Sequence, residues 1–311
     1  DHIHCMCGAE KTEGNTCAKC NTKAVQWQGI TAMPKTSAPG YYYLENDVTV
    51  APFAVKSGDF AFCLCGHTMT SAEGRRMLEA TGNAAITITD CAETVGMITG
   101  TTGTSGNGMA IRVNAGATFN LYAGKITGHT GSADGAIYVD KGTADTTGGI
   151  FNMYGGEISG NTIRRGAIFA ALASNGQKTA VVRILGGTIT GNTGTGTGNF
   201  TGGAGIMGLT SVEVGGNAKI YGNTTAAGPA DIYIRDDQGC KLVISADVPL
   251  TEGARIAYGT MNPDNAEDLQ FIEGTPDASS WNNEWVTYAG KNVKYRDGIF
   301  FTAAEIVISG H

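Results

Sequence analysis

The sequence has little charge, and its basic residues do not cluster. Charged residues make up 16% of the 311 residues, the 21 Lys and Arg residues are scattered, and the formal net charge is −7. Proteins that bind nucleic acid or anionic membrane surfaces carry basic patches, so we expect no nucleic-acid partner. No apolar run approaches the roughly 20 residues that span a bilayer, so we also expect no membrane insertion.

Proline is scarce as well, and glycine has no regular period. The 7 prolines and the irregular spacing of the 47 glycines exclude a collagen-like triple helix. Disorder is excluded because 41% of the residues are hydrophobic and blocks of like charge are absent. The chain therefore belongs among folded proteins, and its abundant Gly, Thr and Asn are typical of secreted bacterial β-structure.

What the sequence does contain is internal repetition. A motif of the form Ile-Thr/Ser/Tyr-Gly-Asn/His-Thr recurs, and its successive copies end 32, 31 and 31 residues apart. The copies run from Ile126 to Thr130, Ile158 to Thr162, Ile189 to Thr193 and Ile220 to Thr224, with a degenerate copy from Ile98 to Thr102. A fixed period of this length is the signature of a repeat architecture, in which each unit packs on its neighbours.

Each unit also holds two further short segments with alternating apolar residues. One set comprises 119–122, 151–154, 182–185 and 212–214, and the other comprises 110–113, 136–139, 167–170, 205–207 and 231–234. Alternation, β-branched residues and flanking Gly, Asn and Thr turns indicate strands, and no unit contains a helical pattern of ten residues. We therefore predict an all-β fold, a right-handed single-stranded parallel β-helix with three short strands per coil and roughly eight coils.

Stacked coils place equivalent residues in columns. The motif isoleucines are expected to form an inward ladder, with a second ladder at Ile111, Ile137, Ile168, Ile206 and Ile232. Asn161, Asn192 and Asn223 fall at one turn, where amide side chains can hydrogen-bond along the column. His129 replaces the ladder Asn in one coil, and we interpret it as a turn variant. The glycines before these positions, Gly128, Gly160, Gly191 and Gly222, are expected to supply positive φ angles.

The repeat divides the chain into three parts. Residues 1–30 are predicted to form a Cys-rich knob that binds metal or is closed by disulfides. Residues 31–261 are predicted to form the parallel β-helix. Residues 262–311 lose the repeat and are predicted to form a C-terminal β cap, because an uncapped last coil would expose unpaired strand backbone.

The repeats resemble a known family. The likeness is carried by Phe151-Asn-Met-Tyr-Gly-Gly-Glu-Ile-Ser-Gly-Asn-Thr162 and Leu185-Gly-Gly-Thr-Ile-Thr-Gly-Asn-Thr193, with Leu64-Cys-Gly-His-Thr68 upstream. Over about residues 40 to 260 these segments look like β-helix repeat proteins of pectate-lyase-like fold from the cell surfaces of Gram-positive, often gut-dwelling, anaerobic bacteria. The resemblance implies the fold and a secreted or cell-surface location, and it implies adhesion or carbohydrate binding by analogy alone.

Four of the eight cysteines, Cys5, Cys7, Cys17 and Cys20, lie within the first twenty residues. Two close thiol pairs joined by a short loop suit a tetrahedral Zn²⁺, and a site closed by four thiolates is structural. Two disulfides or free thiols are the alternatives. His2 and His4 are possible substitutes for one of the thiol ligands.

The other cysteines give weaker signals. Cys65 and Cys91 lie one coil apart and fit either a disulfide or buried free thiols. Cys63 and Cys240 show no partner by spacing.

An outward column is the candidate binding face. If the second isoleucine ladder points inward, the next positions point outward, namely Arg112, Tyr138, Phe169, Met207 and Tyr233. Aromatic faces at coil spacing would form a stacking platform for a glycan or for a host or cell-surface protein. The alternative is that the inserted loops 140–149 and 171–179 fold over the column and bury it.

Catalytic residues are harder to find, although many β-helices act on polysaccharides. Glycosidases need two carboxylates at a fixed separation, yet the acids between residues 100 and 230 are only Asp134, Asp140, Asp145, Glu157 and Glu213. Asp236-Asp237 resembles the paired aspartates of polygalacturonases, but that family's Gly-His-Gly and Arg-Ile-Lys elements are missing. We interpret this pair as a solvated turn and Arg164-Arg165 as a solvated loop.

The sequence thus predicts a non-catalytic surface module for adhesion or glycan binding. We expect a monomer or a part of a longer surface protein, with no organic cofactor. A polysaccharide hydrolase or lyase is the first alternative, and a passive surface stalk is the second.

Overall fold

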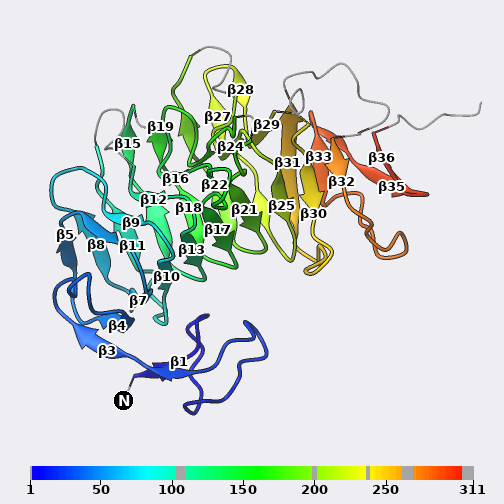
Figure 1. The fold of residues 1–311 in the computed structure, drawn as a ribbon. Coiled ribbons are helices and arrows are strands. Elements are labelled where there is room, and N and C mark those ends of the chain that lie inside the picture. Colours follow the sequence, from blue (N-terminus) through cyan, green and yellow to red (C-terminus); the bar gives the residue numbers. More distant parts are fainter. Residues whose placement is uncertain are drawn as a thin grey trace, which may run out of the picture.

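The computed structural model describes residues 2–102, 109–132, 134–174, 176–197, 202–235, 239–260, 269 and 271–302. These residues form an all-β parallel β-helix of about seven turns, without a helix (Figure 1). The predicted fold class is confirmed, and the number of turns is close to the roughly eight expected. No helix in these ranges is long and apolar enough to cross a membrane.

The first sheet contains ten strands that all pair in parallel. Strands of two to five residues repeat once per coil, and the turns that end the alternating runs are in several cases Gly-rich. In order across the sheet they are β3 (Gln28–Ile30), β4 (Gly40–Leu44), β7 (Asp59–Cys63), β10 (Ala85–Thr89), β13 (Thr118–Leu121), β17 (Ile150–Met153), β21 (Val181–Ile184), β25 (Val212–Val214), β30 (Leu242–Ile244) and β32 (Ile272–Glu273).

The second sheet has 17 strands and consists of two ladders that meet at β31 (Arg255–Thr260). One ladder contains β5 (Val48–Val50), β8 (Thr68–Ser71), β11 (Met97–Thr99), β14 (Lys125–Thr127), β18 (Glu157–Ser159), β22 (Thr188–Thr190) and β26 (Lys219–Ile220), and beyond β31 it continues with β33 (Val286–Tyr288) and β34 (Lys291–Asn292). The other contains β6 (Phe53–Val55), β9 (Leu78–Ala80), β12 (Ile111–Val113), β16 (Ile137–Val139), β20 (Ile168–Ala170), β24 (Ile206–Gly208) and β29 (Ile232–Ile234).

Three smaller sheets complete the fold. The middle coils carry a fourth ladder of two-residue strands, which the three-strand prediction did not include: β15 (Thr130–Gly131), β19 (Thr162–Ile163), β23 (Thr193–Gly194), β27 (Thr224–Thr225) and β28 (Gly228–Pro229). The remaining two are antiparallel pairs, β1 (Ile3–His4) with β2 (Val25–Gln26) and β35 (Lys294–Arg296) with β36 (Ile299–Phe301).

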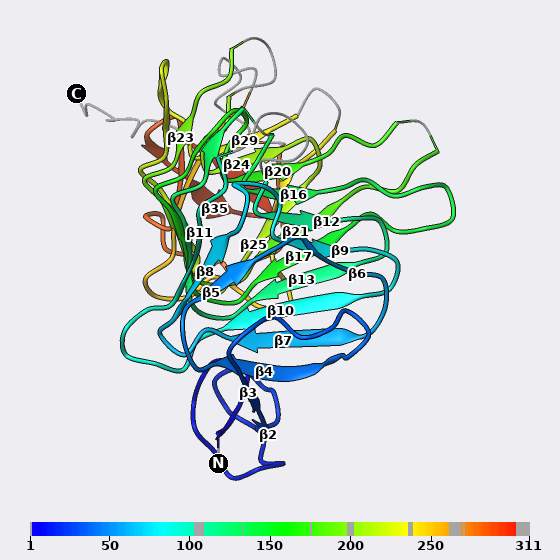
Figure 2. The ribbon, with the colours of Figure 1, turned by 90° about the vertical axis from the view of Figure 1, so that its left-hand side faces the viewer.

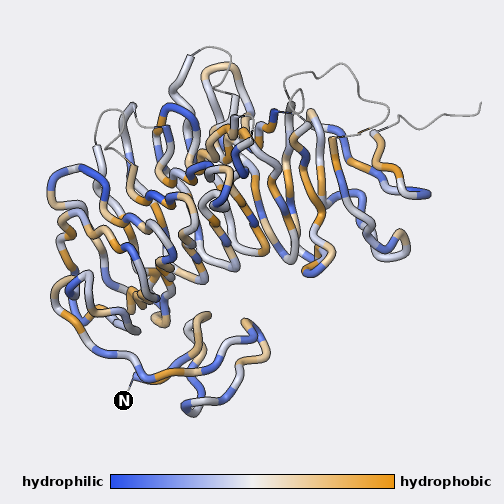
Figure 3. Tube along the Cα trace, viewed as in Figure 1, coloured by the Kyte–Doolittle hydropathy of each residue, from blue (hydrophilic) through white to orange (hydrophobic). Residues whose placement is uncertain are grey.

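Residues that recur at the repeat period in the sequence pair with one another in neighbouring coils of the structure. Ile126 pairs with Ile158, Ile158 with Ile189, and Ile189 with Ile220, and all four side chains are fully buried. The second predicted ladder, from Ile111 to Ile232, also stacks in register. Figure 3 shows the resulting alternation of apolar and polar residues around the coils. A continuous apolar column of this kind provides the main stabilisation of the β-helix.

The predicted asparagine ladder is present and ends at an acid. The backbone N and Nδ2 of Asn161 donate to Asn192 Oδ1 at 3.1 and 2.9 Å, and those of Asn192 donate to Asn223 Oδ1 at 3.1 and 2.8 Å. Asn223 in turn donates to Asp231 Oδ1 from both atoms at 2.7 Å. The buried amide groups of this turn are therefore hydrogen-bonded by the equivalent residue of the next coil. The glycine preceding each ladder residue has the expected positive φ of 62° to 72°.

The N-terminal segment, residues 2–27, which we call the knob, packs on the outer face of the first sheet. It lies beneath β4 and β7 in Figures 1 and 2. Thr89 Oγ1 donates a hydrogen bond to the carbonyl of Met6, and Trp27 is buried against the outward side chains of Ala61 and Cys63. Alternation explains this contact, because the neighbouring residues of β7, Phe60 and Phe62, point into the core.

Candidate functional site

The four N-terminal cysteines converge on one point. The sulfur atoms of Cys5, Cys7, Cys17 and Cys20 all lie within 4.8 Å of one another, with Cys5 and Cys7 at 3.4 Å and Cys7 and Cys17 at 3.7 Å. A tight turn brings Cys20 back to Cys17, because Asn21 adopts a φ of 52° and donates its N–H to the Cys17 carbonyl at 2.8 Å. These four cysteines have free thiols in this structure. The donor set fits a metal ion.

Electrostatics support a cation between these sulfurs. The backbone N–H of Cys20, together with the Cys5 thiol, lowers the pKa of the Cys17 thiol to about 6. Burial raises the pKa of Cys5 to about 12, and burial also raises that of Cys7. The pKa of Cys20 is lowered too, because the effect of its burial is outweighed by hydrogen bonds from Thr22 and Cys7. Four thiolates in contact need a bound positive charge to stay ionised.

The predicted outward column exists in register but is largely covered. Arg112 pairs with Tyr138, Tyr138 with Phe169, Phe169 with Met207, and Met207 with Tyr233. Phe169 is 2% exposed and Met207 is fully buried, in a small cluster with Ala171 and Leu209. The middle of the column is therefore an outer hydrophobic layer, and Tyr138 and Tyr233 on either side of it are half-buried.

The two inserted loops beside the column pair with each other. Gly142 donates its N–H to the Lys178 carbonyl at 2.8 Å, and Lys178 donates to the Thr143 carbonyl at 3.1 Å. Arg112, next to these loops, is engaged too. Arg112 Nη2 lies 2.9 Å from Asp140 Oδ2 and its guanidinium lies over the Tyr138 ring. Arg112 itself is consequently not free to bind an acidic sugar.

Arg164 and Arg165 both pair with one acid, rather than being merely solvated. Arg164 Nη1 and Arg165 Nε lie 3.3 and 3.5 Å from Asp134 Oδ1. The Arg165 guanidinium also lies 5.2 Å from the centre of the Phe169 ring, which helps to cover it. Arg165 thus helps to close the outer layer over the column.

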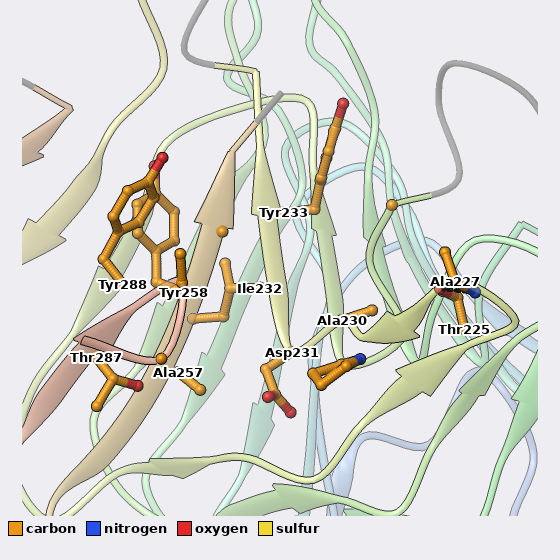
Figure 4. Close-up of a pocket in the computed structure, with 15 residues that line it drawn as sticks. Thr225, Ala227, Ala230, Asp231, Ile232, Tyr233, Ala257, Tyr258, Thr287 and Tyr288 are labelled. Carbon is orange, nitrogen blue, oxygen red and sulfur yellow. Dashed lines mark hydrogen bonds between the residues drawn. The ribbon is translucent and has the colours of Figure 1, made fainter. Parts of the chain in front are cut away.

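Beyond the last residue of the column lies a pocket of about 600 Å³. Figure 4 shows Tyr233 on one side of it and the Tyr258 and Tyr288 rings on the other, with the Asp231 carboxylate directed away from the three rings. The pocket is lined by Gly202, Thr225, Ala227, Pro229, Ala230, Asp231, Ile232, Tyr233, Ala257, Tyr258, Gly259, Thr287, Tyr288, Ala289 and Gly290. Its size is that of typical small-ligand sites, and its lining is mainly apolar with a few polar groups.

Sequence reasoning identified Tyr233 but missed the opposite wall of the pocket. Tyr258 and Tyr288 pair in register on β31 and β33, with ring centres 5.8 Å apart. The residues that could have predicted this wall are Ile256 and Val286, two positions earlier on each strand, which pair and continue the inward isoleucine column past the last clear repeat. Val286 and Tyr288 lie beyond residue 262, where the C-terminal cap was predicted to begin.

Four of the five acids between residues 100 and 230 are engaged in ion pairs. Glu157 pairs with Lys125 at 3.0 Å, Glu213 pairs with Arg183 at 2.9 Å, and Asp134 and Asp140 pair with arginines as above. Burial raises the pKa of Asp231, whose Oδ1 terminates the asparagine ladder. Asp236 and Asp237 lie outside the described residues.

Comparisons with protein-family models, with curated proteins and with solved structures find no match to this chain. Interpretation of its sites therefore depends on the geometry of the thiol cluster, the column and the pocket.

Proposed function

We propose that the protein is a non-catalytic, secreted or cell-surface β-helix module that binds a neutral glycan in the pocket beside Tyr233. The observation that carries this proposal is the pocket itself, about 600 Å³ in volume and bordered by tyrosines at the end of the outer column. Tyrosine rings offer an apolar face for the C–H side of a sugar and a hydroxyl for hydrogen bonding. Gly202 lies against the Tyr233 ring, where an added Cβ would come within 2.3 Å of it, so the ring is held in position.

A neutral sugar fits the charge of the site. The described residues that line the pocket include no Lys or Arg and one acid, Asp231. Anionic sugars are recognised through cations and paired hydrogen bonds, which this lining lacks. Hydroxyl donors and acceptors of Thr225 and Thr287 suit an uncharged polyol instead.

The same geometry favours binding over catalysis. Glycoside hydrolysis uses two carboxyl groups about 5 to 10 Å apart on either side of the bond. Among the described lining residues Asp231 is a single carboxyl group, and the ladder amide of Asn223 occupies its Oδ1. Asp231 therefore has a structural role, as the last hydrogen-bond acceptor of the asparagine ladder.

The thiol cluster has a structural role in this proposal. Zn²⁺ is the ion that four clustered thiolates select, and four sulfur ligands leave no position for a reactive water. Zinc bound by Cys5, Cys7, Cys17 and Cys20 stabilises a knob that has few buried apolar residues of its own.

The test is a glycan array probed with the full chain and three variants. Tyr233→Ala removes a wall of the pocket. Gly259→Phe fills it, since a Cβ at Gly259 would meet no atom closer than 3.8 Å. Tyr154→Ala is the matched control, because this tyrosine is 42% exposed and does not line the pocket. Bound glycans are then analysed by mass spectrometry for cleavage.

We expect the wild-type chain and Tyr154→Ala to bind the same neutral glycans without cleaving them. Both pocket variants should bind about tenfold more weakly, since an aromatic contact contributes up to ~1.5 kcal/mol. Cleavage products would establish a polysaccharide-active enzyme instead. A folded chain that binds no glycan on the array would contradict the proposal and favour a passive stalk.

A further inference from the structure

A second cluster of metal-binding side chains lies between the knob and the β-helix. His2 and His4 come from the knob, whereas Cys63 ends β7 and Cys91 follows β10. One donor atom from each of the four residues lies within 4.8 Å of the other three. These residues are up to 89 positions apart, and the coil register brings them together because Cys63 pairs with Thr89, two residues before Cys91.

His4 is held in the orientation that metal-binding histidines adopt. Its Nδ1 lies 2.8 Å from the Cys5 carbonyl, to which it donates, so its Nε2 carries a lone pair. That Nε2 is buried without a hydrogen-bond partner, in a residue only 1% exposed. The ring stacks on Trp27 at 4.4 Å, and Trp27 Nε1 donates to the His4 carbonyl at 3.0 Å. An orphaned buried acceptor is costly in a protein, whereas a ring nitrogen fixed by a carbonyl on its other side is the usual second contact of a ligating histidine.

His2 and the two thiols complete the cluster. His2 Nε2 lies 3.4 Å from Cys91 Sγ, and its ring stacks on Tyr43 at 4.0 Å. Cys63 is fully buried, and Cys91 is half-buried beside it. Tetrahedral zinc with bonds of about 2.3 Å to sulfur and 2.0 Å to nitrogen spaces its ligand atoms about 3.3 to 3.8 Å apart. The cluster needs only a slight contraction to reach that geometry.

We propose that His2, His4, Cys63 and Cys91 form a second zinc site, which joins the knob to the β-helix. On binding, the two thiols release one proton each and the two imidazoles bind as neutral ligands through lone pairs. The net charge of the filled site is then zero, which suits its buried position against Trp27. The site is independent of glycan binding and of the metal content of the four-cysteine cluster.

Cys65 is the neighbouring thiol that the experiment must distinguish. Its Sγ lies 3.5 Å from Cys91 Sγ, but it does not belong to the group whose four donor atoms lie mutually within 4.8 Å. Its variant therefore serves as the close control. Cys240 lies far along the chain, outside both clusters, and provides a distant one.

The test measures zinc per chain on the reduced, full-length protein after dialysis against excess zinc. We expect two zinc ions in the wild type and one in Cys63→Ser/Cys91→Ser, whereas Cys65→Ser and Cys240→Ser should retain two. His2→Ala alters a half-buried side chain and should fold normally. It should weaken binding of the second ion by at least about tenfold.

Cobalt supplies a readout that does not depend on the variants. The wild type loaded with two Co²⁺ should show absorption from an S₄ site and from an S₂N₂ site, with stepwise filling on titration. Equal zinc content in the wild type and in the folded Cys63→Ser/Cys91→Ser variant, the absence of S₂N₂ absorption from the cobalt-loaded wild type, or a disulfide involving Cys91 in the protein as isolated would each overturn the proposal.

Discussion

At the scale of single residues, His129 shows how the fold controls a titratable group. Its Nε2 donates to the Ile98 carbonyl at 3.0 Å, as ladder asparagines do through Nδ2, and its Nδ1 accepts from the Thr101 hydroxyl at 2.7 Å. Its backbone N–H donates to Asn161 Oδ1 at 3.1 Å, which continues the ladder. The neutral imidazole thus imitates an amide, and its role is architectural, as the sequence indicated.

Protonation of His129 should destabilise the fold. Burial lowers its pKa from 6.5 to about 4, so the unfolded chain binds a proton between these values and the folded chain does not. The stability present above pH 6.5 is therefore lost as the pH falls toward 4, by roughly 3 kcal/mol at most. Urea unfolding at pH 7, 5.5 and 4.5 measures the decline.

His129→Asn is the matched variant for this measurement. Asparagine restores the ladder amide and removes the titrating group, so the pH dependence should be shallower than in the wild type. Carboxylates titrate in both proteins, so the difference between the two curves isolates the histidine. Parallel curves would show that His129 keeps its ordinary pKa.

At the scale of elements, a Gly-Gly pair terminates several strands of the first sheet. Such pairs follow β17, β21 and β25, and the second glycine of each has a positive φ, between 56° and 80°. At Gly187, a Cβ would lie 2.7 Å from the Gly155 backbone of the preceding coil. The pair therefore meets two requirements, a left-handed backbone and close contact between coils.

Two alanine substitutions separate these requirements. Gly191→Ala, at a φ of 62° with no atom within 4 Å of the new Cβ, should lose about 1 to 2 kcal/mol from backbone strain. Gly187→Ala, at a φ of 80°, should lose a further 1 to 3 kcal/mol because the coils must move apart. The free energy of unfolding in urea tests this order, and equal losses would rule out a steric role for Gly187.

At the scale of the whole molecule, the knob and the β-helix are held by different interactions. The β-helix contains a continuous hydrophobic core from Tyr42 to Phe300. The knob contributes Trp27, Met6 and Val25 to a separate cluster on the outer face. The proposed zinc ions, when bound, would therefore supply a larger share of the knob's stability than of the β-helix's.

Removal of the proposed zinc ions by a chelator should thus make the knob less ordered and leave the β-helix folded. We expect a strong zinc chelator to make residues 2–27 sensitive to protease, while the far-UV circular dichroism and the remaining chain stay intact. Intact-mass analysis of the digest identifies the cleavage site, and restored zinc should restore protection. Digestion of the entire chain, or unchanged resistance, would contradict this division.

The periodic part of the structure could be predicted from the sequence, because each coil contacts the next with the same residues. Ile158 and Asn161 recur at the coil period, so their columns followed from spacing alone. The two-residue ladder beginning at Thr130 was missed, since strands of two residues give no periodic signal. Phe169 was placed outward correctly, but it is covered in part by Arg165, which does not repeat.

The sequence by itself determined the β-helix, its two isoleucine columns, the asparagine ladder and the four clustered N-terminal cysteines, all of which depend on local spacing. The tertiary structure alone decided what non-repeating segments bring together. It places His4 beside Cys63 and Cys91, and it sets Tyr233 opposite Tyr258 across a pocket. The physical reason is that a knob or a loop can dock at many positions on a solenoid, and only complementary packing in three dimensions selects one.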